Sequence, residues 1–266
     1  MAGNDPQAFA AATAVASKSE GRFYGEIAPG WDILGNANGG YLLSIASRAA
    51  SQAAGGRFPA TVTGHFVAPA RPGPFSVDTS VIKEGRRFTT VQAVMFDSDR
   101  PILALTGSFG DESTEVSSIE RIEAEAPDLP PAEECVRVEP TETFPPPFVG
   151  KVELRLHPDD ASGRLGQPRA RGWFRLLDDE PIDAFGLLVA VDAFPPTVFF
   201  AQMPIAWTPT LELTAHLRRR PEPGWLRCLF STRFISGGFL EEDGEVWDSS
   251  GRLVAQSRQL ALLPRA

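Results

Sequence analysis

Hydrophobic and polar residues alternate along two segments near the C-terminal end of the chain. Residues 210–217 (TLELTAHL) would place leucines and an alanine on one face and Thr210, Glu212, Thr214 and His216 on the other. Residues 254–263 (VAQSRQLALL) would place Gln259 on a face shared with Ala255, Ser257, Ala261 and Leu263. A period of two is typical of half-buried strands. Gln259 is therefore expected on a strand, among small and apolar neighbours that leave room for another molecule.

Two further segments have the pattern of helices. Residues 38–52 (NGGYLLSIASRAASQ) begin with Asn38, a favourable N-cap residue, and carry Gly39 and Gly40 in the first turn. An inner apolar stripe follows, made of Tyr41, Leu42, Ile45 and Ala49. Residues 183–194 (DAFGLLVAVDAF) are apolar on nearly every side, so this second helix is expected to be buried all round.

The two halves of the chain share an internal repeat. His65 and His216 are 151 positions apart, and at the same offset Gly73 matches Gly224. Further along, FDSDRPILALTGSF matches WDSSGRLVAQSRQL. A repeat this large indicates two like domains in tandem, each with one helix and about five strands. The short turns DSDR and DSSG suit hairpins, so antiparallel pairing is expected.

The stretch between the halves differs from them in composition. Residues 111–150 are acidic and contain seven prolines, which favours an extended connector. We therefore predict an N-terminal unit at residues 1–110, a connector at 111–168 and a C-terminal unit at 169–266. The predicted fold class is α+β, with each unit a curved antiparallel sheet wrapped around one central helix.

The overall composition excludes several classes of protein. The chain of 266 residues has a net charge of -9, so it lacks the basic excess expected of a nucleic-acid binder. No apolar run of about 18 residues predicts a membrane span, and the alanine-rich N-terminus lacks the positive charge of a signal peptide. A cytoplasmic protein is expected. Cys135 and Cys228 fit no Cys/His cluster, so no metal site is expected.

Asp192 is the one charged residue in residues 187–200 (LLVAVDAFPPTVFF). A buried carboxylate without partners is destabilising or changes its pKa. Helical spacing puts Asp192 on a helix with Phe185 and Leu188, and Pro195 and Pro196 are expected to end that helix just beyond it. A carboxylate near a helix C-terminus is electrostatically disfavoured, so a partner must explain it. Asp192 is therefore a candidate functional residue; the alternative is a buried Asp that bonds backbone groups of the neighbouring unit.

Several segments together resemble the acyl-CoA thioesterase II (TesB-like) family of the thioesterase-like superfamily. They are NANGGYLLSIASRAA, PGPFSVDTSVIKEGRRFTTV, DAFPP, PTLELTAHLRRRP and VAQSRQLALL. The resemblance covers most of the chain outside the connector and implies a double hotdog fold. It also implies hydrolysis of acyl-CoA between the two units, in fatty acid metabolism, with CoA as part of the substrate and no separate cofactor. Assembly of whole chains into dimers or tetramers is implied as well.

The catalytic group implied by this resemblance is an Asp, a Thr and a Gln that activate a water molecule. In this chain they are Asp192, Thr210 and Gln259, with Thr208 as the alternative threonine. A carboxylate can partly deprotonate such a water, and the hydroxyl and the amide can fix its orientation. The family pattern has more residues between its Asp and Pro than the DAFPP of this chain, so the geometry after Asp192 stays open.

Six residues are candidates for substrate binding: Asn38, Gly39, Gly40, Arg86, Arg87 and Arg218. The first three could offer backbone N–H groups to a developing oxyanion, or the two glycines could serve tight packing of the helix. The three arginines could contact the phosphates of CoA, and the alternative for them is a solvated charge cluster.

Two functions other than hydrolysis are also considered for this sequence. No GxSxG, GxxxxGK[ST] or GxGxxG motif occurs, and His65, His157 and His216 show no arrangement with a Ser nucleophile. A hotdog hydratase or dehydratase acting on acyl-CoA is one alternative, although that chemistry usually needs a His beside the Asp. A non-catalytic acyl- or lipid-binding protein is the other. The joint presence of Asp, Thr and Gln favours the thioesterase.

Overall fold

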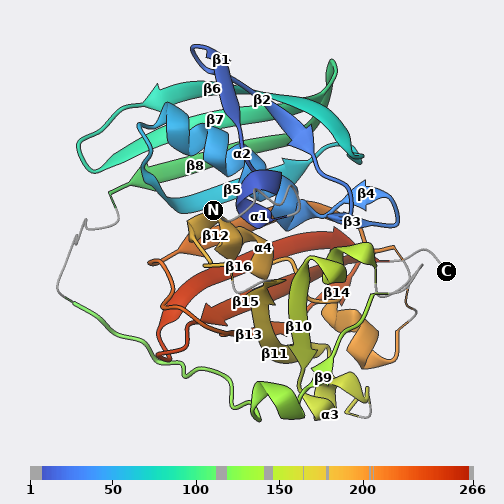
Figure 1. Cartoon of the computed structure of the whole chain (residues 1–266). Coiled ribbons are helices and arrows are strands. Elements are labelled where there is room, and N and C mark those ends of the chain that lie inside the picture. The colour runs from blue at the N-terminus through green and yellow to red at the C-terminus, as the bar shows by residue number, and fades with distance from the viewer. Residues whose placement is uncertain are drawn as a thin grey trace, which may run out of the picture.

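The computed structural model of the chain describes residues 8–111, 119–140, 146–163, 165–177, 180–203, 205 and 207–263. It shows two units, one from each half of the chain, that lie one above the other (Figure 1). Every strand pairing in them is antiparallel. The α+β class predicted from the sequence is confirmed.

The first unit wraps a sheet around one long helix, α2 (Gly39–Ala53). The sheet runs in the order β1 (Ala16–Ser19), β2 (Arg22–Ile27), β6 (Gly73–Lys83), β7 (Phe88–Asp97), β8 (Arg100–Gly110), β5 (Phe58–Phe66). A short helix and a two-stranded ribbon precede α2: α1 (Phe9–Ala12), β3 (Asp32–Ile33) and β4 (Asn36–Ala37). Asn38 is the N-cap, as predicted, because its side chain accepts a hydrogen bond from the Tyr41 N–H.

The second unit repeats this plan around a shorter helix, α4 (Ala184–Ala190). Its sheet order is β12 (Thr210–Leu217), β16 (Leu253–Leu262), β15 (Phe239–Trp247), β13 (Leu226–Ser231), β11 (Arg169–Leu176), β10 (Val152–Leu156), β9 (Val136–Arg137). β14 (Ile235–Ser236) pairs with β15. The short helical turns are η1 (Ala132–Glu134), η2 (Pro147–Gly150), α3 (Pro158–Ala161) and η4 (Thr197–Ala201). All of α4 except Phe185 is buried, which confirms the expectation from its apolar sequence.

The two sheets join into one where β5 pairs with β12. Thr63 lies directly opposite Thr214, and their hydroxyl oxygens are 2.8 Å apart. These two residues are separated by the offset of the sequence repeat. A pseudo-two-fold axis therefore passes between the strands at this point and relates the two units.

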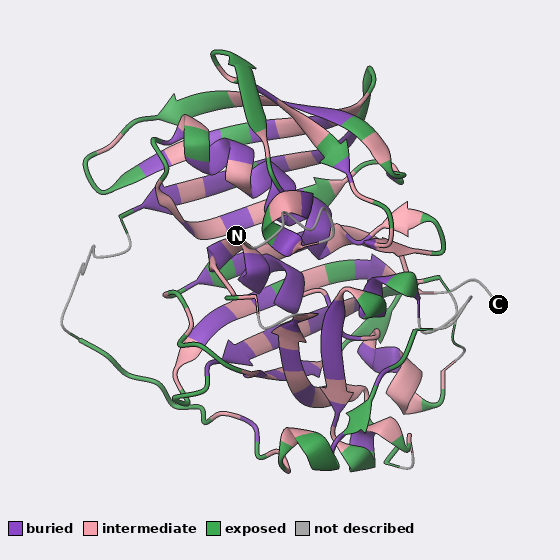
Figure 2. Ribbon diagram, in the orientation of Figure 1, coloured by how far each residue is buried: buried purple, intermediate pink, exposed green. Residues whose placement is uncertain are grey.

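The central helices lie against each other and run antiparallel. Gly40, near the start of α2, touches the end of α4, since a Cβ placed on it would lie 2.5 Å from the Leu188 carbonyl oxygen. The Ser44 hydroxyl donates to the Phe185 carbonyl at 2.8 Å. Small residues on this face of α2 thus permit the close approach, and both helices are buried beneath the sheets (Figure 2).

Two details differ from the sequence prediction. α4 ends at Ala190, so Asp192 lies in the following turn and not on the helix, with its N–H donating to the Val189 carbonyl at 3.0 Å. The prolines at 195 and 196 force the chain out of helical geometry sooner than expected. The segment predicted as connector also contributes β9 and β10 to the second sheet. β10 lacks a two-residue period because four of its five residues are buried, on both faces.

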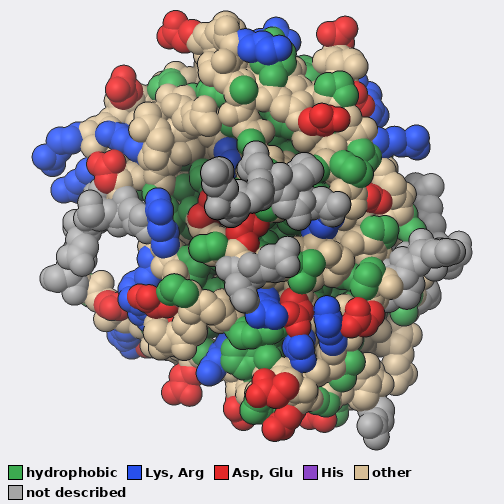
Figure 3. All heavy atoms as spheres, viewed as in Figure 1, with side chains coloured by type: hydrophobic (Ala, Val, Ile, Leu, Met, Phe, Trp, Pro, Cys, Tyr) green, Lys and Arg blue, Asp and Glu red, His purple; other side chains and the backbone are tan. Residues whose placement is uncertain are grey.

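The surface has no dominant charge on the face seen in Figure 3, where acidic and basic side chains are interspersed. Within the described residues, no helix combines the length and the apolar character needed to cross a bilayer.

Candidate active site

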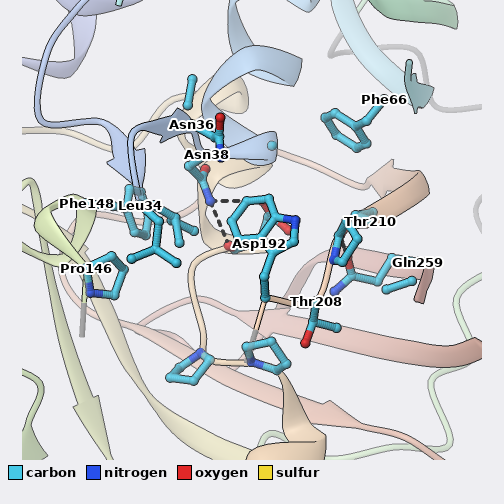
Figure 4. Close-up of a pocket in the computed structure, with 18 of the residues that line it drawn as sticks. Leu34, Asn36, Asn38, Phe66, Pro146, Phe148, Asp192, Thr208, Thr210 and Gln259 are labelled. Carbon is cyan, nitrogen blue, oxygen red and sulfur yellow. Dashed lines mark hydrogen bonds between the residues drawn. The ribbon is translucent and has the colours of Figure 1, made fainter. Parts of the chain in front are cut away.

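A cavity of about 510 Å³ lies where the two units and the end of the connector meet. Asp192, Thr208, Thr210 and Gln259 all line it, together with Asn38 from the first unit. The rest of its wall is mainly apolar and includes Ile33, Leu34, Leu42, Phe66, Phe148, Val149, Phe194, Phe199, Trp207 and Leu240. In Figure 4, Asp192 lies near the centre, with Thr210 and Gln259 on one side and Leu34, Pro146 and Phe148 on the other.

Asp192 is held at this position by the N-terminal end of α2. Its Oδ2 accepts hydrogen bonds from the Gly40 N–H at 2.7 Å and from Asn38 Nδ2 at 3.0 Å. Asn38 Nδ2 also donates to the Asp192 carbonyl oxygen at 3.2 Å. The side chain is deep in the protein yet keeps some surface toward the cavity, so a small molecule there can reach it.

Burial, with a smaller contribution from the negative charge of Glu242, raises the pKa of Asp192 to about 7. The hydrogen bonds from Gly40, Asn38 and Gly39 favour the charged form and limit this rise. Asp192 is therefore partly protonated and partly ionised near neutral pH. Such a carboxyl group can accept a proton and return it within one reaction cycle.

Thr210 and Gln259 form a second part of the site, on neighbouring strands. The Thr210 hydroxyl donates to Gln259 Oε1 at 2.8 Å, and Gln259 Nε2 donates to Glu242 Oε1 at 2.9 Å. Gln259 shares the inner face of β16 with buried residues, as the alternation of the sequence predicts. The hydrogen-bond chain fixes the positions of both side chains at the cavity wall.

A β-bulge turns Thr210 toward the cavity. The pairing of β12 with β16 slips between Thr210 and Glu212, so that Thr210 lies opposite Ala261 while Leu213 lies opposite Gln259. Strict alternation would put Thr210 on the outer face with Glu212, as the sequence pattern suggested; the extra residue moves it to the inner face. Bulges often re-aim a side chain in this way beside functional sites.

The same irregularity occurs at the matching place in the first unit. The β5–β8 pairing slips between Pro59 and Thr61, and Pro59 matches Thr210 at the offset of the repeat. The residue that matches Gln259 there is Ser108. The bulge therefore belongs to the repeated unit, whereas the Thr–Gln pair occurs only in the second half.

At the second pseudo-symmetric position, the carboxylate at the helix N-terminus belongs to the N-cap residue itself, Asp183, whose Oδ1 accepts from the Phe185 and Gly186 N–H groups. Asp183 is the N-cap of α4, and its Oδ2 accepts a hydrogen bond from Arg48 Nη2 at 2.9 Å. The Arg48 guanidinium also stacks over the Phe185 ring, 4.4 Å from its centroid. An ion pair beside an aromatic ring therefore lies at the counterpart of the position where the first unit's helix end meets Asp192.

The predicted binding residues fall into two groups. Asn38 and Gly39 line the cavity, but the N–H of Gly40 is used by Asp192, and its lack of a side chain allows the contact with α4. The packing role considered for the glycines therefore applies to Gly40. Donation of a backbone N–H to an oxyanion stays a prediction.

The three arginines lie outside the cavity wall. Arg86 and Arg87 are exposed in the turn between β6 and β7. The Gly85 carbonyl in this turn accepts a hydrogen bond from Arg57, which follows the C-terminal end of α2. Arg218 follows the end of β12 opposite to Thr210 and donates to Gln256. Contact of these residues with CoA phosphates stays a prediction.

Sequence reasoning missed Glu242 and the part of the connector that reaches the cavity. Glu242 is buried, at 4% exposure, in β15, whose inward positions otherwise carry Leu240, Gly244 and Val246. Reading FLEEDGEVW with a period of two would have marked this carboxylate as inward. Phe148 in η2 is also buried and lines the cavity, but a proline-rich sequence gives no period from which to predict that.

Across the described ranges, no three His, Cys, Asp or Glu side chains come together as a metal site would require.

These features define a double hotdog protein, with a polar site in an apolar cavity between its units. The chain belongs to the acyl-CoA thioesterase family, since the N-terminal domain of that family matches residues 27–110 and its C-terminal domain matches residues 127–263.

Several known proteins are similar to this chain in sequence or fold. A candidate thioesterase II from Thermobifida fusca YX is 34% identical, with a TM-score of 0.86 over 97% of both chains. An acyl-CoA thioesterase II from Mycobacterium marinum shares the fold, at 18% identity and a TM-score of 0.75 over 97% of this chain and 99% of its own. An uncharacterized protein of Mycobacterium tuberculosis is 29% identical over 91% of both chains.

Proposed function

We propose that this protein hydrolyses acyl-CoA thioesters to a free acid and CoA, with a water molecule held by Asp192, Thr210 and Gln259. The observation that carries the proposal is a carboxyl group with a pKa of about 7 in the same cavity as a hydrogen-bonded Thr–Gln pair. A base is most effective when its pKa lies near the working pH. Membership of the acyl-CoA thioesterase family supports this reaction.

The proposed reaction has two proton transfers through one carboxylate. The oxygen of the water attacks the thioester carbonyl carbon while Asp192 takes one of its protons. The C–S bond then breaks, and the departing sulfur receives the proton back from Asp192. The products are a carboxylic acid and the CoA thiol, and no group on the protein is consumed. Thr210 and Gln259 orient the water, so that attack is effectively unimolecular.

The cavity wall favours an uncharged acyl group. Among the described residues that line it, none is Lys, Arg or His. A free carboxylate at the far end of an acyl chain would therefore find no cationic partner. Aliphatic and aromatic side chains cover most of the wall. Burial of apolar acyl surface against them stabilises the complex by about 0.8 kcal/mol for each CH₂ group.

The alternatives are less consistent with this geometry. A hydratase or dehydratase would use a His beside the carboxylate, but His65 and His216 are exposed and His157 caps α3 at its start. A binding protein without turnover would not need a base whose pKa lies near neutrality. Location in the cytoplasm, a role in fatty acid metabolism and assembly into dimers or tetramers stay predictions; cell fractionation and light scattering would test the first and last.

The direct test is an acyl-CoA panel incubated with purified protein, with release of free thiol as the readout. We expect turnover of uncharged acyl-CoAs and loss of turnover in Asp192→Asn. Butanoyl-CoA and succinyl-CoA form a matched pair of neutral and charged acyl groups, and the neutral one should react faster. Binding without thiol release at every chain length would reject hydrolysis in favour of the binding protein.

A further inference from the structure

Glu242 is a buried carboxylate that the reaction above does not use. It lies in β15 directly opposite Gln259 in β16, so the two side chains share the inner face of the sheet. Its Oε1 accepts from Gln259 Nε2 at 2.9 Å, and its Oε2 accepts from the Thr197 N–H at 2.8 Å. A buried carboxylate is destabilising unless it is fully hydrogen-bonded, so both oxygens need these donors.

The partners of Gln259 determine which way its amide faces. Both carboxylate oxygens of Glu242 accept hydrogen bonds from N–H groups, one of them from the NH₂ group of Gln259, which therefore points to Glu242. The Oε1 atom then points to Thr210, whose hydroxyl donates to it. This leaves the second N–H of Gln259 and the lone pairs of Thr210 Oγ1 as a donor and an acceptor for a molecule in the cavity.

Glu242 also acts on Asp192 through its charge. Among the described residues lining the cavity, Asp192 and Glu242 are the only titratable groups. The end of α2 that packs against Asp192 contributes Asn38, Gly39 and Gly40, which carry no charge. Burial raises the pKa of Glu242 itself, and the adjacent Glu241 is paired with Arg233 toward solvent.

We propose that Glu242 is a positioning residue for the hydrolysis. It fixes the amide of Gln259 so that one N–H of Gln259 and the oxygen of Thr210 meet the water and the thioester carbonyl. This inference rests on the proposed function, because it assigns the role within that reaction.

The test is Glu242→Gln, which keeps the shape of the side chain and removes its charge. We expect kcat to fall roughly tenfold, less than the ~10²-fold loss on removing a direct donor, with little change in KM. The acid limb of the pH–rate profile should move to lower pH, because the charge that raises the pKa of Asp192 is gone. Glu241→Gln, a carboxylate one position away on the outer face, should change neither quantity.

A second readout separates this inference from hydrolysis itself. The ¹⁵N–¹H signals of the Gln259 side chain, identified by their loss in Gln259→Glu, should be dispersed in the wild type and shift in Glu242→Gln. Turnover by the wild type with unchanged kcat, pH profile and amide signals in Glu242→Gln would overturn the inference alone. A fixed amide in a wild-type protein with no turnover would overturn the hydrolysis and the inference with it.

A double exchange covers the case in which Glu242→Gln does not fold. Glu242→Gln with Gln259→Glu restores a donor–acceptor pair between the two strands, so it should fold. It should stay inactive, because residue 259 then has no N–H to offer. Wild-type activity in this double variant would refute a positioning role for Glu242.

Discussion

Asp192→Asn should remove activity and at the same time stabilise the folded protein. The Asn keeps one oxygen to accept from the Gly40 N–H and Asn38 Nδ2, so the packing at the end of α2 is preserved. It cannot take a proton from water, and loss of a general base typically lowers rates by about 10²–10⁴-fold. A residue retained at a cost in stability is expected at a catalytic site.

The size of the stabilisation follows from the pKa. Burial raises the pKa of Asp192 from 3.8 to about 7, so between these values the folded state binds more protons than the unfolded state. Stability therefore falls as pH rises through this window, and the loss is complete above pH 7. At ~1.36 kcal/mol for each pKa unit, the ionised Asp192 costs the fold about 4 kcal/mol, an upper value because the Asn amide is also buried.

Thermal unfolding at pH 5 and pH 8 measures this difference. The gap in Tm between Asp192→Asn and the wild type should be on the order of 10 °C at pH 8 and less than half as large at pH 5. Asp248→Asn is a matched control of opposite sign: burial raises the pKa of Asp248, but hydrogen bonds from Ser250 and the Arg252 N–H outweigh it and lower the pKa. That variant should be destabilised at pH 8. A Tm gap for Asp192→Asn that does not depend on pH would refute the reasoning.

Three other changes have defined outcomes. Thr210→Val removes the hydroxyl that donates to Gln259, so kcat should fall about 10- to 10²-fold with KM nearly unchanged, as steady-state kinetics would show. Gly40→Ala places a Cβ 2.5 Å from the Leu188 carbonyl oxygen, so the free energy of unfolding should fall by about 1–3 kcal/mol in denaturant titrations. Arg48→Met breaks the ion pair with Asp183 in the counterpart position, so stability should fall while KM for acyl-CoA stays the same.

Each of these three substitutions has a control variant or an outcome that would contradict the expectation. Thr210→Ser keeps the hydroxyl and should keep most activity, and Thr208→Val should have little effect; the reverse ranking would make Thr208 the site threonine. Wild-type stability in Gly40→Ala would contradict the close contact of the helices. A changed KM in Arg48→Met would mean that the counterpart position takes part in binding.

The features of this chain that can be read from its sequence are those with a local cause. A period of two marks β16 and the inward face that carries Gln259. The N-cap Asn38 and the apolar sequence of α4 are likewise visible in neighbouring residues. The repeat then predicts two like units, because similar sequences fold alike, and the pairing of Thr63 with Thr214 at the same offset follows from it.

The tertiary structure decided what depends on residues far apart in the chain. The bulge beside Thr210 is set by the partner strand, so strict alternation assigns that side chain to the wrong face. The pKa of Asp192 depends on burial between two helices and on Glu242, 50 residues later in the chain. The sequence by itself determined which groups are available. Only the folding of the second unit brought Asp192, Thr210 and Gln259 to one cavity, and its packing on the first unit added Asn38 and part of the wall. Burial, register and charge separation are properties of those contacts and not of any single segment.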